Sequence, residues 1–82
     1  MQLLITRKAS KELNKIPNKL AKKISEKINQ LSTNPYPIHS KKLHNQNNYR
    51  LRYGYFRIIY KVNKKEQAIT ILRIANRNAV YR

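Results

Sequence analysis

The stretch YRLRYGYFRIIYKV, residues 49–62, decides how this chain folds. Aromatic and aliphatic residues alternate with arginine and lysine on both sides of Gly54, the only glycine in the sequence. Period-2 alternation of aromatic and β-branched residues is typical of half-buried strands. A glycine between two such strands suits a tight turn that requires a positive φ. The stretch therefore predicts a β-hairpin with a two-residue loop at Gly54 and Tyr55.

A two-residue loop fixes which residues face each other across the hairpin. It places Arg52 opposite Arg57 and Arg50 opposite Ile59, so that three arginines share one face of the sheet. Like charges in contact across strands destabilise a sheet, by about a few tenths of a kcal/mol. A polyanionic partner is therefore the leading explanation for this arginine row. The alternative is a solvated sheet face whose arginines extend into water.

The composition narrows the classes of partner and chemistry. The chain of 82 residues has nineteen Lys and Arg against three acidic residues, and a formal net charge of +16. Such a charge favours polyanions, with nucleic acid first, an acidic protein second and a membrane surface third. The sequence contains no cysteine, and two histidines without Cys or Asp do not form a convincing metal site. We therefore expect no metal and no cofactor.

Hydrophobic segments give a further expectation. No apolar run reaches the length of a signal peptide or of a transmembrane helix. The interpretation is a cytoplasmic protein that forms a single domain over residues 1–82 and has no membrane partner.

The order of the predicted elements follows from periodicity and breakers. Residues 2–6 form an apolar strand, Thr6 caps a helix that begins at Arg7, and a second helix covers residues 18–32 with one apolar stripe. Two prolines end it, and residues 39–48 read as a polar loop. After the hairpin, residues 68–75 form a central strand.

The predicted fold is α+β with the order β-α-α-β-β-β. An N-terminal strand and a two-helix hairpin are followed by a three-stranded antiparallel meander, with the helices packed on one sheet face. Tyr49, Tyr53 and Tyr60 are expected to pack in the core or across the hairpin. The expected core residues of the strands are Leu51, Ile58, Leu72 and Ile74.

In this order the chain resembles the RelE/ParE toxin superfamily of bacterial toxin–antitoxin systems. Residues 49–60 match its hairpin motif Y-R-[IL]-R-x-G-x-[YF]-R-[IL]-[IL]-Y, Lys41-Lys42-Leu43 matches a K-x-L segment, and ILRIANRNAVYR, residues 71–82, resembles the family's ending. The resemblance covers nearly the whole chain. It implies a RelE-like fold and a toxin that a co-expressed, acidic antitoxin neutralises.

The resemblance also implies a site. In the RelE-like branch the toxin enters the ribosomal A site and cuts mRNA with basic residues on the sheet and a C-terminal tyrosine. The positions that match this catalytic set are Arg50, Arg52, Arg57, Arg77 and Tyr81. The residues expected to bind RNA or the ribosome are Lys41, Lys42, Lys61, Arg73 and Arg82.

A general base is the missing part of this site. Arginine cannot be deprotonated in an ordinary site, and no Asp or Glu is expected near the hairpin arginines. Asn76 stands where the family often has histidine. His39 and His44 lie in the loop before the hairpin, where a lone histidine is usually a surface residue.

Two other functions remain open from the sequence. The ParE-like branch shares the fold but poisons DNA gyrase, and it tends to lack the full basic set and the terminal tyrosine. A degenerate toxin would bind RNA or the ribosome without cutting. The filled basic positions favour the ribosome-dependent mRNA endonuclease over both.

Overall fold

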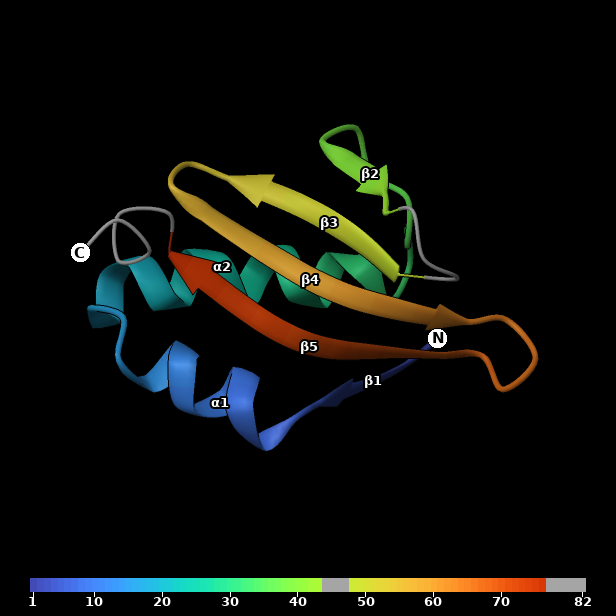
Figure 1. Cartoon of the computed structure of the whole chain (residues 1–82), viewed down its shortest axis with the longest axis horizontal. Helices are drawn as coiled ribbons and strands as arrows, with labels where there is room; N and C mark the ends of the chain where they lie inside the picture. The colour runs from blue at the N-terminus through green and yellow to red at the C-terminus, as the bar shows by residue number, and fades with distance from the viewer. Residues whose placement is uncertain (44–47, 77–82) are drawn as a thin grey trace.

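The computed structural model describes residues 1–43 and 48–76, which form two helices and one five-stranded sheet (Figure 1). The elements are β1 (Gln2–Ile5), α1 (Arg7–Asn14), α2 (Asn18–Leu31), β2 (Ser40–Lys42), β3 (Asn48–Tyr53), β4 (Phe56–Asn63) and β5 (Ala68–Asn76). The predicted α+β class is confirmed. Neither of the two helices is long and apolar enough to cross a membrane.

The hairpin predicted from residues 49–62 is present as β3 and β4. Arg52 pairs with Arg57 and Arg50 pairs with Ile59, in the predicted register. Gly54 adopts a φ of +57° at the first loop position, where a type II′ turn requires a glycine. The ring of Tyr49 stacks on that of Tyr60 across the two strands, with centroids 5.7 Å apart, as expected for cross-strand packing.

The strand order in the sheet is β1-β5-β4-β3-β2. The first strand pairs in parallel with the last, from Gln2 beside Ala68 to Ile5 beside Ile71. The last strand thus lies inside the sheet, which explains why residues 68–75 are apolar on both faces.

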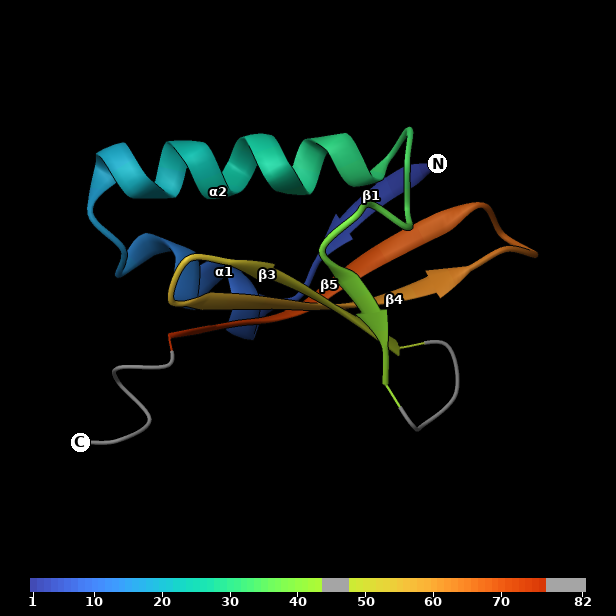
Figure 2. The same ribbon diagram turned by 90° about the horizontal axis from the view of Figure 1, so that it is seen from above.

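One face of the sheet carries the core. Helix α2 lies across this face, and α1 packs against β5 beyond the end of β1 (Figures 1 and 2). Ile24, Ile28 and Leu31 of α2 are buried in one cluster with strand residues such as Ile58 and Tyr60. The expected cap is also present, since the Ala9 N–H donates to Thr6 Oγ1 at 3.1 Å.

The structure corrects the expectation of a loop over residues 39–48. Ser40–Lys42 form β2, which pairs antiparallel with Tyr49, Arg50 and Leu51. This strand is short and lies at the edge of the sheet, with Lys41 and Lys42 exposed. Edge strands of this kind use charge instead of apolar alternation, because charged side chains discourage pairing with other chains. The sequence pattern therefore could not reveal it.

Leu72 was wrongly expected in the core. It is only partly buried, whereas Ile71 and Ile74 are both buried. The reason is a β-bulge: Ile59 pairs with Arg73 and Tyr60 pairs with Ile71, so Leu72 has no partner on β4. The extra residue shifts the alternation of inward and outward side chains by one position, so that Ile71 and Ile74 point to the same face of the sheet.

Candidate functional site

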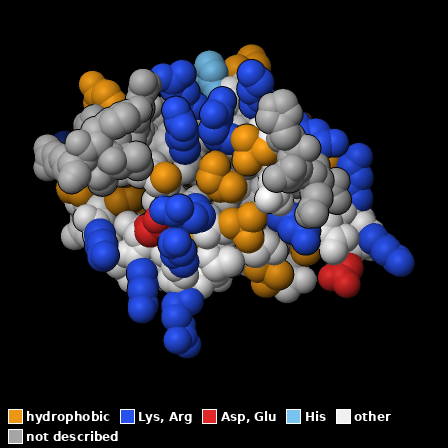
Figure 3. Space-filling model, viewed as in Figure 1, with side chains coloured by type: hydrophobic (Ala, Val, Ile, Leu, Met, Phe, Trp, Pro, Cys, Tyr) orange, Lys and Arg blue, Asp and Glu red, His pale blue; other side chains and the backbone are white. Residues whose placement is uncertain are grey.

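The three hairpin arginines lie on the face of the sheet opposite α2, which we call the open face. Arg52 is exposed, and Arg50 and Arg57 are partly buried. Figure 3 looks onto this face and shows lysine and arginine side chains gathered around a few hydrophobic ones. The expected clustering of the arginines is confirmed for these three positions.

Strand pairing arranges the basic residues in rows across the sheet. One row runs through Lys41, Arg50, Ile59 and Arg73, which are successive partners on β2, β3, β4 and β5. The neighbouring row contains Arg52 and Arg57, followed on β5 by Ala75. Together the rows form a surface of guanidinium and ammonium groups with Ile59 as an apolar floor. Such a surface is chemically suited to phosphate, because guanidinium groups stay charged and donate in pairs.

The other predicted RNA-binding lysines divide between the two faces. Lys61 is exposed and pairs with Asn48, which places it on the open face. Lys42 pairs with Tyr49, whose ring lies on the α2 side, so Lys42 is not part of the open face. The face of Lys42 could not be predicted, because it depends on the pairing of β2 with β3.

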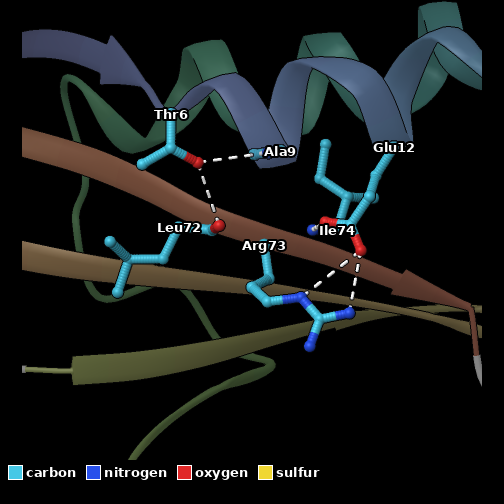
Figure 4. A network of polar contacts seen from close by, with 6 residues as sticks. All are labelled: Thr6, Ala9, Glu12, Leu72, Arg73 and Ile74. Atoms are coloured by element: carbon cyan, nitrogen blue, oxygen red, sulfur yellow. Dashed lines mark hydrogen bonds and ion pairs between the residues drawn. The ribbon is translucent and has the colours of Figure 1, made fainter.

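Arg73 is bound by an acidic residue of α1, Glu12, which no sequence pattern places near the site. Its Nη2 and Nε donate to Glu12 Oε2 at 2.8 and 3.3 Å (Figure 4). The Ile74 N–H donates to Glu12 Oε1 at 2.9 Å. Within the described residues this is the one ion pair, so part of the charge of Arg73 is neutralised inside the protein. Arg50, Arg52 and Arg57 have no such carboxylate partner among the described residues.

Glu12 does not supply the missing base. Partial burial would raise the pKa of its carboxyl, but the hydrogen bonds from Arg73 and Ile74 and the charges of Arg73 and Lys8 lower this pKa below its usual value. A carboxylate with a lowered pKa and both oxygens engaged is a poor proton acceptor. Glu12 contacts Arg73, which is not one of the hairpin arginines, so the expectation that no acid lies near Arg50, Arg52 and Arg57 agrees with the described ion pairs.

His39 lies beside one of the arginines. It is exposed, its carbonyl accepts the Arg52 N–H at 3.3 Å, and it lines a hollow of about 450 Å³ with Lys27, Arg52, Tyr53 and Gly54. The sequence could not show this, because the contact depends on β2 entering the sheet. Residues 1–43 and 48–76 contain no group of three or more metal-binding side chains.

Four predicted residues lie outside the described part of the chain. They are Arg77, Tyr81 and Arg82 of the ending, and His44 of the segment before β3. Their roles stay predictions. The described part of the site therefore consists of the hairpin arginines, Lys41, Lys61 and Arg73.

Known structures share this fold. The chain is similar to the toxin in an archaeal RelE–RelB complex from Pyrococcus horikoshii, with 29% identity, a TM-score of 0.83 and 93% of each chain covered. It is similar to a chain of the RelB–RelE antitoxin–toxin complex from Methanococcus jannaschii, with 26% identity, a TM-score of 0.77, and 95% of this chain and 94% of that chain covered.

A third similar structure is a YoeB/ParE toxin from Agrobacterium tumefaciens. The identity is 15%, the TM-score 0.78, and 93% of this chain and 98% of that chain are covered. At this identity the likeness shows the fold alone. A comparison with curated protein sequences found no match.

The sequence profile of one family matches nearly the whole chain. The profile is described as the ParE toxin of a type II toxin–antitoxin system, parDE, and it matches residues 3–81. The match includes both helices and nearly all of the sheet, with the hairpin arginines of the open face. The chain therefore belongs to the ParE toxin family of type II toxin–antitoxin systems, within the RelE/ParE superfamily.

Proposed function

We propose that this toxin is a ribosome-dependent mRNA endonuclease that inhibits translation. The observation that carries the proposal is the pairing of Arg52 with Arg57, beside Arg50, on a sheet face where no carboxylate neutralises them among the described residues. The fold gains nothing from like charges in this register. An RNA backbone gives them a function.

Cleavage of RNA by its own 2′-OH needs a group that stabilises the pentavalent phosphate. Arg57, from the second hairpin strand, is assigned this task, since a guanidinium offers two parallel donors and a fixed positive charge. Arg50 and Arg52 hold the neighbouring phosphates. Arg77 near the leaving oxygen and Tyr81 on an adjacent base complete the assignment that follows from the family resemblance. Lys41, Lys61 and Arg82 add contacts to ribosomal RNA.

The protein itself needs little acid–base chemistry under this proposal. Positioning of the message in the ribosome and electrostatic stabilisation by the arginines supply the rate enhancement. His39 lies beside Arg52, and the lowered pKa of Glu12 makes that carboxylate a weaker base than usual.

The test is primer extension on mRNA in a purified translation system. The wild-type chain should produce cuts within codons, only on messages that are being translated. Arg57→Ala should reduce cutting by about 100-fold or more, the usual cost of removing one donor to a developing oxyanion. Lys19→Ala removes an exposed charge from α2, on the covered side of the sheet, and should cut like wild type.

Two results would contradict this function. Messages that stay intact with the wild-type chain exclude it, and equal cutting by Arg57→Ala removes Arg57 from the site. A circular-dichroism melt of each variant separates loss of activity from loss of the fold.

The family profile supports a second candidate, poisoning of DNA gyrase, because its description names the ParE toxin of parDE. Under this alternative the open face binds gyrase or its DNA instead of mRNA. A supercoiling assay with purified gyrase distinguishes the two: inhibition with intact messages supports gyrase as the target. Binding of RNA without cutting and without gyrase inhibition supports a non-catalytic toxin.

We also propose an acidic antitoxin as the partner that covers the open face. The similar structures from Pyrococcus horikoshii and Methanococcus jannaschii are of toxins in complex with an antitoxin. A basic face on which Arg50, Arg52 and Arg57 have no carboxylate partner among the described residues suits an acidic segment that folds on binding. Association should slow strongly as salt is raised. An association rate independent of salt would argue against this mode.

A further inference from the structure

A second basic hollow lies at the end of the sheet opposite the Gly54 turn. Its volume is about 260 Å³, and it lies where β3 begins and β4 ends. We call it the Tyr36 pocket. Its polar and aromatic lining comes from Tyr36, Lys42, Tyr49, Asn63, Lys64 and Lys65. These residues belong to four separate segments, so no local sequence pattern indicates the pocket.

The ring of Tyr36 packs against the ring of Tyr49. Its centroid lies 5.1 Å from that of Tyr49 at an interplanar angle of 54°, and Tyr49 in turn stacks on Tyr60. The Tyr60 hydroxyl donates to the Pro35 carbonyl at 2.6 Å, and the Tyr36 N–H donates to Asn34 Oδ1 at 3.2 Å. Tyr36 is nevertheless 42% exposed. It is an aromatic surface that needs little ordering before it stacks on another ring.

Three lysines surround this ring. Lys64 Nζ lies 5.8 Å from the centre of the Tyr36 ring, and Lys42 and Lys65 are exposed at the rim. No acidic side chain is among the residues that line the pocket. Glu66 follows in the same turn but does not line it. The pocket therefore combines an open aromatic ring with uncompensated positive charge.

We propose that the Tyr36 pocket binds one unpaired nucleotide of a nucleic-acid strand. The base stacks on Tyr36, and the attached phosphates lie among Lys64, Lys65 and Lys42. Aromatic rings beside basic residues bind single strands in this way, because every base has a π face and every unit has a phosphate. The ring favours a nucleotide over an acidic peptide, whose carboxylates need the lysines alone.

The pocket has room for about one nucleotide. Its volume of about 260 Å³ is just below the range of about 300–1,000 Å³ that is usual for small-molecule sites. A strand adds contacts outside it. Lys41 and Lys42 are adjacent on β2, with Lys41 beside Arg50 on the open face and Lys42 beside Tyr49. A strand that passes around β2 would reach both sites.

The proposal does not rest on RNA cleavage or on the ribosome. It concerns a separate surface and is tested with the full-length chain and a fluorescein-labelled single-stranded hexanucleotide, followed by fluorescence anisotropy. Tyr36→Ala should weaken binding about tenfold, in the range for loss of one stacked base. Tyr36→Phe keeps the ring and should bind within about twofold of wild type.

Charge variants give the second arm of the experiment. The double variant Lys64→Ala with Lys65→Ala should weaken binding and lower the salt slope by about two, one for each phosphate contact. The matched control is Lys19→Ala with Lys23→Ala, which removes two exposed charges from α2 and should weaken binding much less. These lysine variants also keep the proposal testable if Tyr36→Ala fails to fold in a thermal melt.

Four outcomes would overturn the proposal. In the first, folded Tyr36→Ala binds the hexanucleotide with wild-type affinity, and in the second, Tyr36→Phe loses as much affinity as Tyr36→Ala. In the third, the control variant Lys19→Ala with Lys23→Ala loses as much affinity as Lys64→Ala with Lys65→Ala. In the fourth, a hexaglutamate probe binds in a Tyr36-dependent way and the hexanucleotide does not. A titration with 5′-AMP distinguishes the source of the nucleotide. Weak binding of 5′-AMP supports a strand, whereas 5′-AMP affinity equal to that of the hexanucleotide would make the pocket a site for a free nucleotide.

Discussion

At the scale of single residues, Glu12 connects the core to the open face. Its carboxylate accepts the Ile74 N–H at the position where β1 has ended and the edge of β5 would otherwise be open. Thr6 also binds a backbone group of β5, since its hydroxyl donates to the Leu72 carbonyl at 3.0 Å. Both backbone groups are thus satisfied from α1, one by its N-cap Thr6 and the other by Glu12 (Figure 4). Unpaired backbone groups on a partly buried edge would be costly.

Glu12→Gln is expected to lower the free energy of unfolding by about 1–2 kcal/mol at pH 7, because it weakens hydrogen bonds to a charged acceptor. The ion pair contributes the smaller share, since the Arg73 side chain is 46% exposed and water screens it. The measurement is urea unfolding followed by circular dichroism. Glu26→Gln, an equal charge change at an exposed position of α2, should leave stability within about 0.5 kcal/mol.

The same variant has a pH signature. The pKa of Glu12 is lowered in the folded state, so its contribution to stability is fully present above its ordinary pKa of 4.5. This contribution is lost as the pH falls through the pKa of the folded state. The difference between wild type and Glu12→Gln should therefore shrink in acid. A difference that is constant from pH 7 to about pH 3 would show that the charge of Glu12 is unimportant.

At the scale of elements, the buried Tyr60 ties the segment after α2 to the middle of the sheet. Tyr60 is fully buried on β4, and its hydroxyl donates to the Pro35 carbonyl at 2.6 Å. Burial raises the pKa of this phenol to about 12. The folded state therefore holds Tyr60 protonated at pH values where an unfolded chain would ionise it.

Tyr60→Phe should cost about 1 kcal/mol near pH 8, since it removes one buried hydrogen bond and leaves the Pro35 carbonyl without it. The raised pKa adds an alkaline effect: the contribution of Tyr60 is full below pH 10, its ordinary value, and is lost as the pH rises toward about 12. The free energy of unfolding should decrease less between about pH 8 and about pH 11 in Tyr60→Phe than in wild type. Tyr55→Phe, at an exposed turn position, should behave like wild type.

The elements show what the sequence can and cannot predict. The hairpin followed from alternation around Gly54, and the register of Arg52 with Arg57 followed from the loop length. The bulge at Leu72 and the edge strand β2 did not, because both depend on the pairing of a neighbour and leave no apolar period of their own. A local hydrophobic pattern therefore predicts that a strand exists, whereas bulges and edge strands depend on the neighbouring strand with which it pairs.

At the scale of the whole molecule, charge opposes the compact state. The formal net charge is +16, and one ion pair joins acid to base within the described residues. Raising salt from about 0.05 to 0.5 M shortens the screening length severalfold and should weaken the self-repulsion. We expect the thermal midpoint to rise by about 5 °C, which corresponds to roughly 1 kcal/mol for a domain of this size. Differential scanning fluorimetry measures it.

The control for this prediction is a neutral osmolyte at the same osmolality, which screens no charge and should not reproduce the full shift. A midpoint that falls with salt would mean that attractive pairs such as Glu12 with Arg73 outweigh the repulsion. Lowering the charge by Lys19→Ala with Lys23→Ala should reduce the salt effect slightly.

The candidate site was predictable only in part at this scale. Composition and the hairpin motif identified the arginines, and strand pairing then placed Lys41 and Lys61 with them. Glu12 on Arg73, His39 beside Arg52 and the Tyr36 pocket each join segments far apart in the chain. No local period links such residues, so their juxtaposition depends on tertiary structure.

The parallel pairing of β1 with β5 has a consequence for the order in which the protein is built. β1 is synthesised before the other described strands, but its partner is the last of them, and the hydrogen bond from Thr6 to the Leu72 carbonyl joins residues 66 positions apart. Contacts between such distant segments form late, because the loop between them must close first. During its own synthesis the chain should therefore remain an open, unfinished sheet. The arginine surface, which includes Arg73 of β5, would be completed only after this last described strand has been made.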